Sequence, residues 1–81
     1  MKIYVLTIVD TQNYGFNPKD VEVYTDIKKA NERMKSLYLA KCKEEGIETP
    51  YEGDSMYGMT EDYYAFVNWW YVDIFEKEVE L

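Results

Sequence analysis

Apolar residues fill both sides of the first expected strand. Between Lys2 and Asp10 the chain is rich in β-branched and aromatic residues, and both alternating sets of side chains are largely apolar. Such a strand usually has both faces covered, so we expect residues 2–10 to form the central strand of a sheet. Thr11 to Asp20 contains Asn, Gly and Pro, which predict a hairpin loop. Val21 to Tyr24 alternates again and predicts a short second strand.

The next segment has the spacing of an amphipathic helix. Thr25 and Asp26 are suitable N-cap residues, and Gly46 is a natural stop. The helix would span about 19 residues, or roughly 29 Å, enough to cross a sheet. Its apolar stripe comprises Ile27, Ala30, Met34, Leu37, Tyr38 and Cys42.

The segment after the helix begins without a clear period. Residues 46–60 include Pro50 and, after Gly46, the glycines Gly53 and Gly58, and they predict a loop. Residues 63–67 are rich in strand-forming side chains, which favours a strand there. However, Thr60 followed by two acids also suits the cap of a short helical turn, so helix and strand both stay open for Thr60 to Val67.

The last segment is too long for one unbroken strand. We therefore expect a bend or tight turn at Asn68 or at the Trp69-Trp70 pair. Apolar residues 72 and 74 have the opposite parity to residues 79 and 81, which predicts a one-residue bulge near Phe75 or Glu76. The whole pattern predicts a single α+β domain over residues 1–81. An antiparallel sheet of about four strands, in the chain order β-β-α-β-β, would have one long helix packed on one face.

Charge is distributed unevenly along this pattern. The chain carries 16 acidic and 9 basic residues, for a formal net charge of −7. Eleven of the acids and only one base, Lys77, lie between Glu44 and Leu81. Such a surface repels phosphates, which argues against direct binding to nucleic acid and favours a basic protein surface as partner.

The sequence offers little for catalysis. It has no histidine, and Cys42, its one cysteine, lies beside the apolar helix stripe, where a buried and inert thiol is expected. Adjacent acid pairs such as Glu44-Glu45 are best explained as solvated surface. The acids of residues 52–62 lack the alternation of a calcium loop. We therefore expect no enzymatic activity, no metal and no cofactor.

Cysteine usage and hydropathy suggest where the protein works. A single cysteine allows no internal disulfide, which favours a reducing, cytoplasmic setting. The apolar stretches at residues 3–9 and 63–72 are far shorter than the roughly 20 residues that a membrane helix needs. Neither a signal peptide nor a membrane partner is therefore expected.

Binding through the surface is the remaining class of function. Several of the aromatic residues should lie on the sheet face that the helix leaves open, as should one of Trp69 and Trp70, and an open aromatic face is typical of an interface. The candidates for this face are Tyr4, Tyr64, Phe66, Trp70 and Phe75. The charged candidates belong to the segment from Glu48 to Asp62, here called the acidic loop. The predicted partner-binding residues are Glu48, Glu52, Asp54, Glu61 and Asp62 for charge, with Trp70 as an aromatic anchor. The alternative is a structural protein that forms homodimers through the open face.

One local motif resembles a known type of small protein. The segment Val21-Glu-Val-Tyr-Thr-Asp-Ile-Lys-Lys-Ala30 follows a strand and opens a helix, and it resembles a strand-strand-helix module of small bacterial and phage proteins. That resemblance implies no catalytic residues. In size and acidity the chain is also similar to phage anti-defence proteins such as anti-CRISPR inhibitors. The analogy implies an inhibitor that occupies the basic nucleic-acid-binding groove of a host protein.

Overall fold

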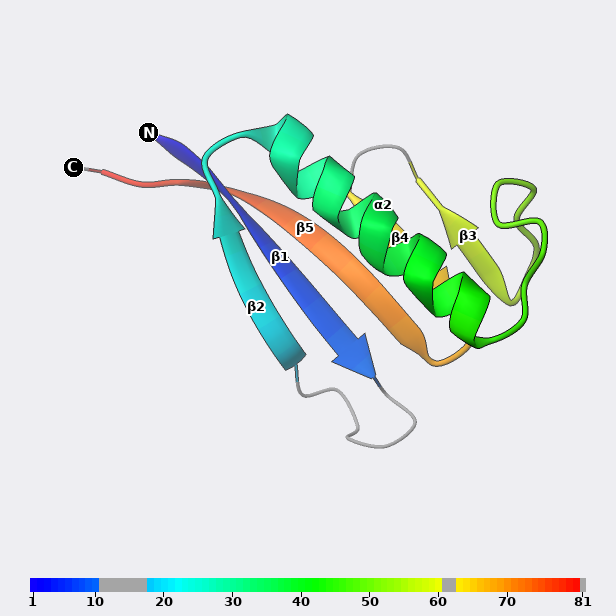
Figure 1. Cartoon of the computed structure of the whole chain (residues 1–81). Coiled ribbons are helices and arrows are strands. Elements are labelled where there is room, and N and C mark those ends of the chain that lie inside the picture. Colours follow the sequence, from blue (N-terminus) through cyan, green and yellow to red (C-terminus); the bar gives the residue numbers. More distant parts are fainter. Residues whose placement is uncertain (11–17, 61–62, 81) are drawn as a thin grey trace.

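In the part of the chain that the structure describes, one helix covers one face of a five-stranded antiparallel sheet (Figure 1). The computed structural model describes residues 1–10, 18–60 and 63–80. The strand order across the sheet is β2-β1-β5-β4-β3. The elements are β1 (Lys2–Asp10), β2 (Pro18–Tyr24), α2 (Ile27–Glu44), β3 (Tyr57–Met59), β4 (Tyr64–Val67) and β5 (Trp70–Glu78).

The predicted α+β class, with one helix on an antiparallel sheet, is confirmed, but the strand count and order are not. The sheet has five strands, and the additional one is β3, which lies within the segment predicted as a loop. Its Gly58 resembles a loop glycine in the sequence. In the fold, a Cβ at Gly58 would lie 3.1 Å from the ring of Phe66 on β4, so the glycine permits close approach of the two strands.

The central strand is β5 and not β1. β5 pairs with β1 over nine positions, from Lys2↔Glu78 to Asp10↔Trp70, and with β4 on its other side. β1 is an interior strand because β2 pairs along its other edge. The two apolar faces of β1 therefore predicted correctly that it is an interior strand. Which interior strand is central depends on pairings between distant segments, which those faces do not indicate.

The helix begins and ends where its sequence signals lie. The Oδ1 atom of Asp26, the N-cap residue, accepts a hydrogen bond of 2.9 Å from the backbone N–H of Lys28. Beyond the last turn, Gly46 adopts a φ of 74°, which favours glycine. The buried helix residues are Ala30, Met34, Tyr38 and Cys42, as the apolar stripe predicted. They pack against Leu6, Ile8, Ala65, Val67, Trp70, Val72 and Ile74 of the sheet.

Turns and irregularities partly follow the predictions. Residues 64–67 form a strand, and the expected turn lies at residues 68–69, where Asn68 has a φ of 53°. The predicted bulge near Phe75 or Glu76 is wrong, because β1 and β5 pair in unbroken register. β5 ends at Glu78, so the parity change after it needs no bulge, and the register shift of the sheet lies at residues 8–9 of β1. β2 begins at Pro18, three residues earlier than expected, and residues 11–17 of the predicted hairpin loop lie outside the described part.

No helix within residues 1–10, 18–60 and 63–80 combines the length and apolar character that crossing a membrane requires.

Candidate protein-interaction surfaces

The sheet face opposite the helix is lined by largely apolar side chains, and we call it the uncovered face. Strand alternation places on it the residues that neighbour the core positions in sequence. These are Ile3, Val5, Thr7 and Val9 of β1, Val21 and Val23 of β2, Tyr64 and Phe66 of β4, and Tyr71, Asp73, Phe75 and Lys77 of β5. Val9, at the end of β1, is only 4% exposed. None of the helices and strands in the described residues packs over this face, since α2 contacts the sheet through its buried core residues.

The register gathers the uncovered face into rows that run across the strands. One row joins Val23, Val5 and Phe75 on three neighbouring strands. Val23 is 59% exposed and Phe75 is 55% exposed, so this row is both apolar and open to solvent. Contiguous exposed apolar side chains of this kind mark interaction sites more often than inert surface.

An aromatic cluster extends the uncovered face toward β4. The ring centroid of Tyr64 lies 5.8 Å from that of Phe66 and 5.8 Å from that of Tyr71. Burial raises the pKa of Tyr64, and the neighbouring Asp73 carboxylate raises it further. The Tyr64 hydroxyl therefore stays protonated at physiological pH and can donate a hydrogen bond to a partner.

Among the described side chains of the uncovered face, the charged ones are Asp73 and Lys77, four residues apart on β5. Burial raises the pKa of the Asp73 carboxyl above its usual range. The apolar and aromatic neighbours of Asp73 thus solvate its charge poorly, and a cation brought by a partner would relieve that cost.

The acidic loop is the second surface, and the helix holds part of it in place. The Tyr38 hydroxyl donates a hydrogen bond of 2.6 Å to the backbone carbonyl of Pro50. Burial raises the pKa of Tyr38, so the phenol remains a donor. Because Tyr38 lies in the core under α2, this bond fixes the loop to the helix layer and not to the uncovered face.

The structure exposes three of the predicted charged residues, Glu48, Glu52 and Asp54. The Asp54 Oδ1 atom also accepts a hydrogen bond of 2.6 Å from the backbone N–H of Met56, so Asp54 shapes the turn in addition to carrying charge. Glu61 and Asp62 lie outside the described residues.

Sequence reasoning missed an exposed aromatic residue of this loop. Tyr51 is 66% exposed and lies between Glu48 and Asp54 in the chain. The Lys35 ammonium nitrogen lies 5.5 Å from its ring centroid, within the range of a cation–π contact. Its position directly after Pro50, in a segment without apolar periodicity, was the available signal.

The predicted anchor Trp70 does not lie on the open sheet face. It is 8% exposed and belongs to the core under α2, whereas Trp69 is 64% exposed. Val67 and Trp70 pair directly, so Asn68 and Trp69 form the turn and Trp70 takes the parity of Val72. The placement of this turn, which the sequence left open, decides which indole is buried.

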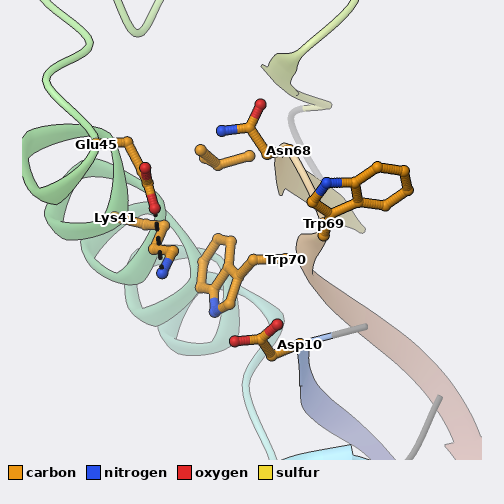
Figure 2. A pocket seen from close by; sticks show the side chains of 7 residues that line it. Asp10, Lys41, Glu45, Asn68, Trp69 and Trp70 are labelled. Atoms are coloured by element: carbon orange, nitrogen blue, oxygen red, sulfur yellow. Dashed lines mark ion pairs between the residues drawn. The ribbon is translucent and has the colours of Figure 1, made fainter. Parts of the chain in front are cut away.

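A polar pocket of about 280 Å³ lies beside the buried indole (Figure 2). Figure 2 shows Trp70 between Lys41 of α2 and Asp10 at the end of β1. The Lys41 ammonium already pairs with Glu44 at 3.3 Å and with Glu45 at 3.7 Å. The pocket therefore presents little uncompensated charge from Lys41 to a ligand.

The one cysteine thiol, in the core, is also poorly suited to chemistry. Cys42 is buried, and burial raises the pKa of its thiol, which disfavours the nucleophilic thiolate. Within the part of the chain that the structure describes, no cluster of three or more side chains is arranged to hold a metal ion.

Comparison of the chain with known protein families, curated proteins and solved structures gives no significant match. The uncovered face and the acidic loop are therefore the features of the molecule that bear on its function.

Proposed function

We propose that this protein is a non-enzymatic interaction module that binds other protein surfaces. The observation that carries the proposal is the uncovered face, on which exposed Val23, half-buried Val5 and exposed Phe75 form a continuous apolar row. Interfaces draw most of their affinity from such apolar and aromatic side chains.

The acidic loop directs this module toward a basic partner. A net charge of −7, with Glu48 and Glu52 exposed beside Tyr51, accelerates encounters with a positive surface. The partner class that fits is a nucleic-acid-binding protein, whose basic groove the loop would occupy in place of phosphates. Together with the resemblance to small phage proteins, this supports the role of an inhibitor carried by a phage or another mobile element.

The test is capture followed by competition. Immobilised protein should retain nucleic-acid-binding proteins from a bacterial lysate, and added duplex DNA should release them. Glu48→Lys combined with Glu52→Lys should reduce retention and its dependence on salt. Asp54 is left unchanged because its carboxylate also holds the turn.

The matched control is Glu32→Lys combined with Glu80→Lys, which changes the net charge equally at exposed positions outside the loop. Equal loss of retention in both double variants would show that net charge acts and the loop does not. Failure to retain any nucleic-acid-binding protein would remove the basic-groove proposal.

The second candidate function is a structural one, in which two copies associate through the uncovered face. This is favoured by the described side chains of that face, where apolar residues surround Asp73 and Lys77. The two candidates are compatible, because the acidic loop is held to the helix layer on the other side of the sheet.

A further inference from the structure

We infer that the occupant of the uncovered face is a second copy of this chain, packed with its β5 strand antiparallel to the first. The two-fold axis would lie between the sheets and run across the strands along the row of Val23, Val5 and Phe75. This inference rests on the proposed interaction function, and it adds the identity and the orientation of the partner.

The longest pairing in the sheet defines where such an axis fits. β1 and β5 pair over nine positions, and Val5↔Phe75 lies next to the middle of that ladder. With a two-fold axis on this row, the β1–β5 pair of one copy would pack against the β1–β5 pair of the other along nearly the full length of the strands. The exposed side chains of Phe75 and Val23 would then meet their own counterparts at the centre of the interface.

The charges of the uncovered face select this orientation. Asp73 precedes Phe75 by two residues and Lys77 follows it by two, each about 7 Å along the strand. An axis across the strands reverses β5, so each Asp73 faces Lys77 of the second copy and each Lys77 faces Asp73. An axis parallel to the strands would instead oppose Asp73 to Asp73 and Lys77 to Lys77, and such like-charge contacts are unfavourable.

The environment of Asp73 supports the same pairing. Its register neighbours are Thr7 on β1 and Tyr64 on β4, and Tyr71 lies two residues before it on its own strand. None of these neighbours is cationic, and burial raises the pKa of the carboxyl. An ammonium group from the second copy would supply the missing positive charge to both ends of a symmetric interface.

The size of the contact is that of a weak interface. The shared footprint is about nine residues long and three strands wide, or about 30 Å by 14 Å. That corresponds to about 420 Å² from each copy, about half the roughly 800 Å² per partner of a standard stable interface and in the range of weak, transient ones. We therefore expect a reversible dimer with a dissociation constant in the micromolar range.

Sedimentation equilibrium across micromolar concentrations tests the inference with charge-swapped variants. Wild type should convert from monomer to dimer, and Phe75→Arg should remain monomeric. Asp73→Lys and Lys77→Asp should each weaken the dimer about tenfold or more, because each places like charges opposite one another. The double variant with both substitutions should recover most of the lost affinity, since it restores opposite charges at both positions.

Controls separate these effects from misfolding and from net charge. Lys29→Asp makes the same charge change as Lys77→Asp on the exposed surface of α2 and should leave the dimer unchanged. Far-UV circular dichroism and a thermal melt check that each variant folds. Lys77 and Phe75 are exposed, so Lys77→Asp and Phe75→Arg keep the test valid even if Asp73→Lys fails to fold.

The outcomes distinguish this inference from the function beneath it. A monomer at all concentrations overturns the inference, while lysate capture still tests the interaction function separately. If Phe75→Arg breaks the dimer, the uncovered face is confirmed as an interface. If, in addition, the double variant of Asp73 and Lys77 does not recover the affinity that the single variants lose, the orientation is overturned. A dimer insensitive to Phe75→Arg overturns the uncovered face as the site of pairing.

Discussion

The hydrogen bond from Tyr38 to the acidic loop should stabilise both the fold and the loop, and Tyr38→Phe removes it with minimal change of shape. The phenol is 0% exposed, and its oxygen lies 2.6 Å from the Pro50 carbonyl oxygen. A typical intramolecular hydrogen bond contributes about 1 kcal/mol, and a buried carbonyl left unpaired adds a further penalty of about 1 kcal/mol or more. Pro50 is half-buried, so water can compensate part of that penalty. We expect Tyr38→Phe to lower the free energy of unfolding by about 1–2 kcal/mol.

Urea denaturation is the appropriate measurement. The midpoint should fall while the m-value stays constant, and the Tm should drop by about 4–8 °C for each kcal/mol lost. Hydrogen exchange should accelerate at the backbone amides of Glu52 and Asp54. These amides donate to the carbonyls of Thr49 and Tyr57 and depend on the loop remaining in place.

Tyr57→Phe is the matched control. The Tyr57 hydroxyl lies 3.1 Å from the Thr49 hydroxyl in an exposed hydrogen bond. Water can replace that bond, so its removal should cost less than about 0.5 kcal/mol. If Tyr38→Phe costs no more than Tyr57→Phe, or if loop exchange is unchanged, then the Tyr38 hydroxyl does not hold the acidic loop and the reasoning fails.

Four further substitutions test the burial and electrostatics of the sheet. Asp73→Asn should raise the Tm of the dilute monomer at pH 7 but not at pH 3, because burial raises the carboxyl pKa and wild type loses stability as pH rises through that pKa; an equal change at both pH values would contradict this. Trp70→Ala should cost about 3 kcal/mol or more in urea denaturation, whereas Trp69→Ala should cost less than about 1 kcal/mol, and similar costs would contradict the assigned burial. Glu22→Gln should cost about 0.5–1 kcal/mol at neutral pH, because the paired Arg33 lowers the pKa of the Glu22 carboxyl. That deficit should vanish at low pH, where wild-type Glu22 is also protonated, and a deficit that persists there would exclude the ion pair as its cause.

Local signals predicted the helix well because its determinants lie close together in the chain. The Asp26 cap, the apolar stripe and the stop at Gly46 each act within one or two turns. The inward side chains of the stripe, such as Met34 and Tyr38, followed directly from helical spacing.

The missed features depend on contacts between distant segments. β3 has only three residues, too few for a clear sequence pattern. Its pairing with β4 depends on the close approach of Gly58 to the ring of Phe66, which the sequence does not indicate. Likewise, the choice between Trp69 and Trp70 depended on the turn that closes β4 onto β5. A one-residue shift of that turn would exchange the two indoles between core and solvent.

The two candidate surfaces lie on different layers, which has a consequence for the proposed function. Pairing of two copies through the uncovered face would leave both acidic loops exposed, since Tyr38 holds each loop to the helix layer. It would also bring together two chains that each carry a net charge of −7. Their mutual repulsion opposes dimerisation most strongly at low salt, whereas a basic partner that contacts both loops would offset it. Such a partner would therefore favour the dimer, and the dimer would bind that partner more tightly than one copy alone.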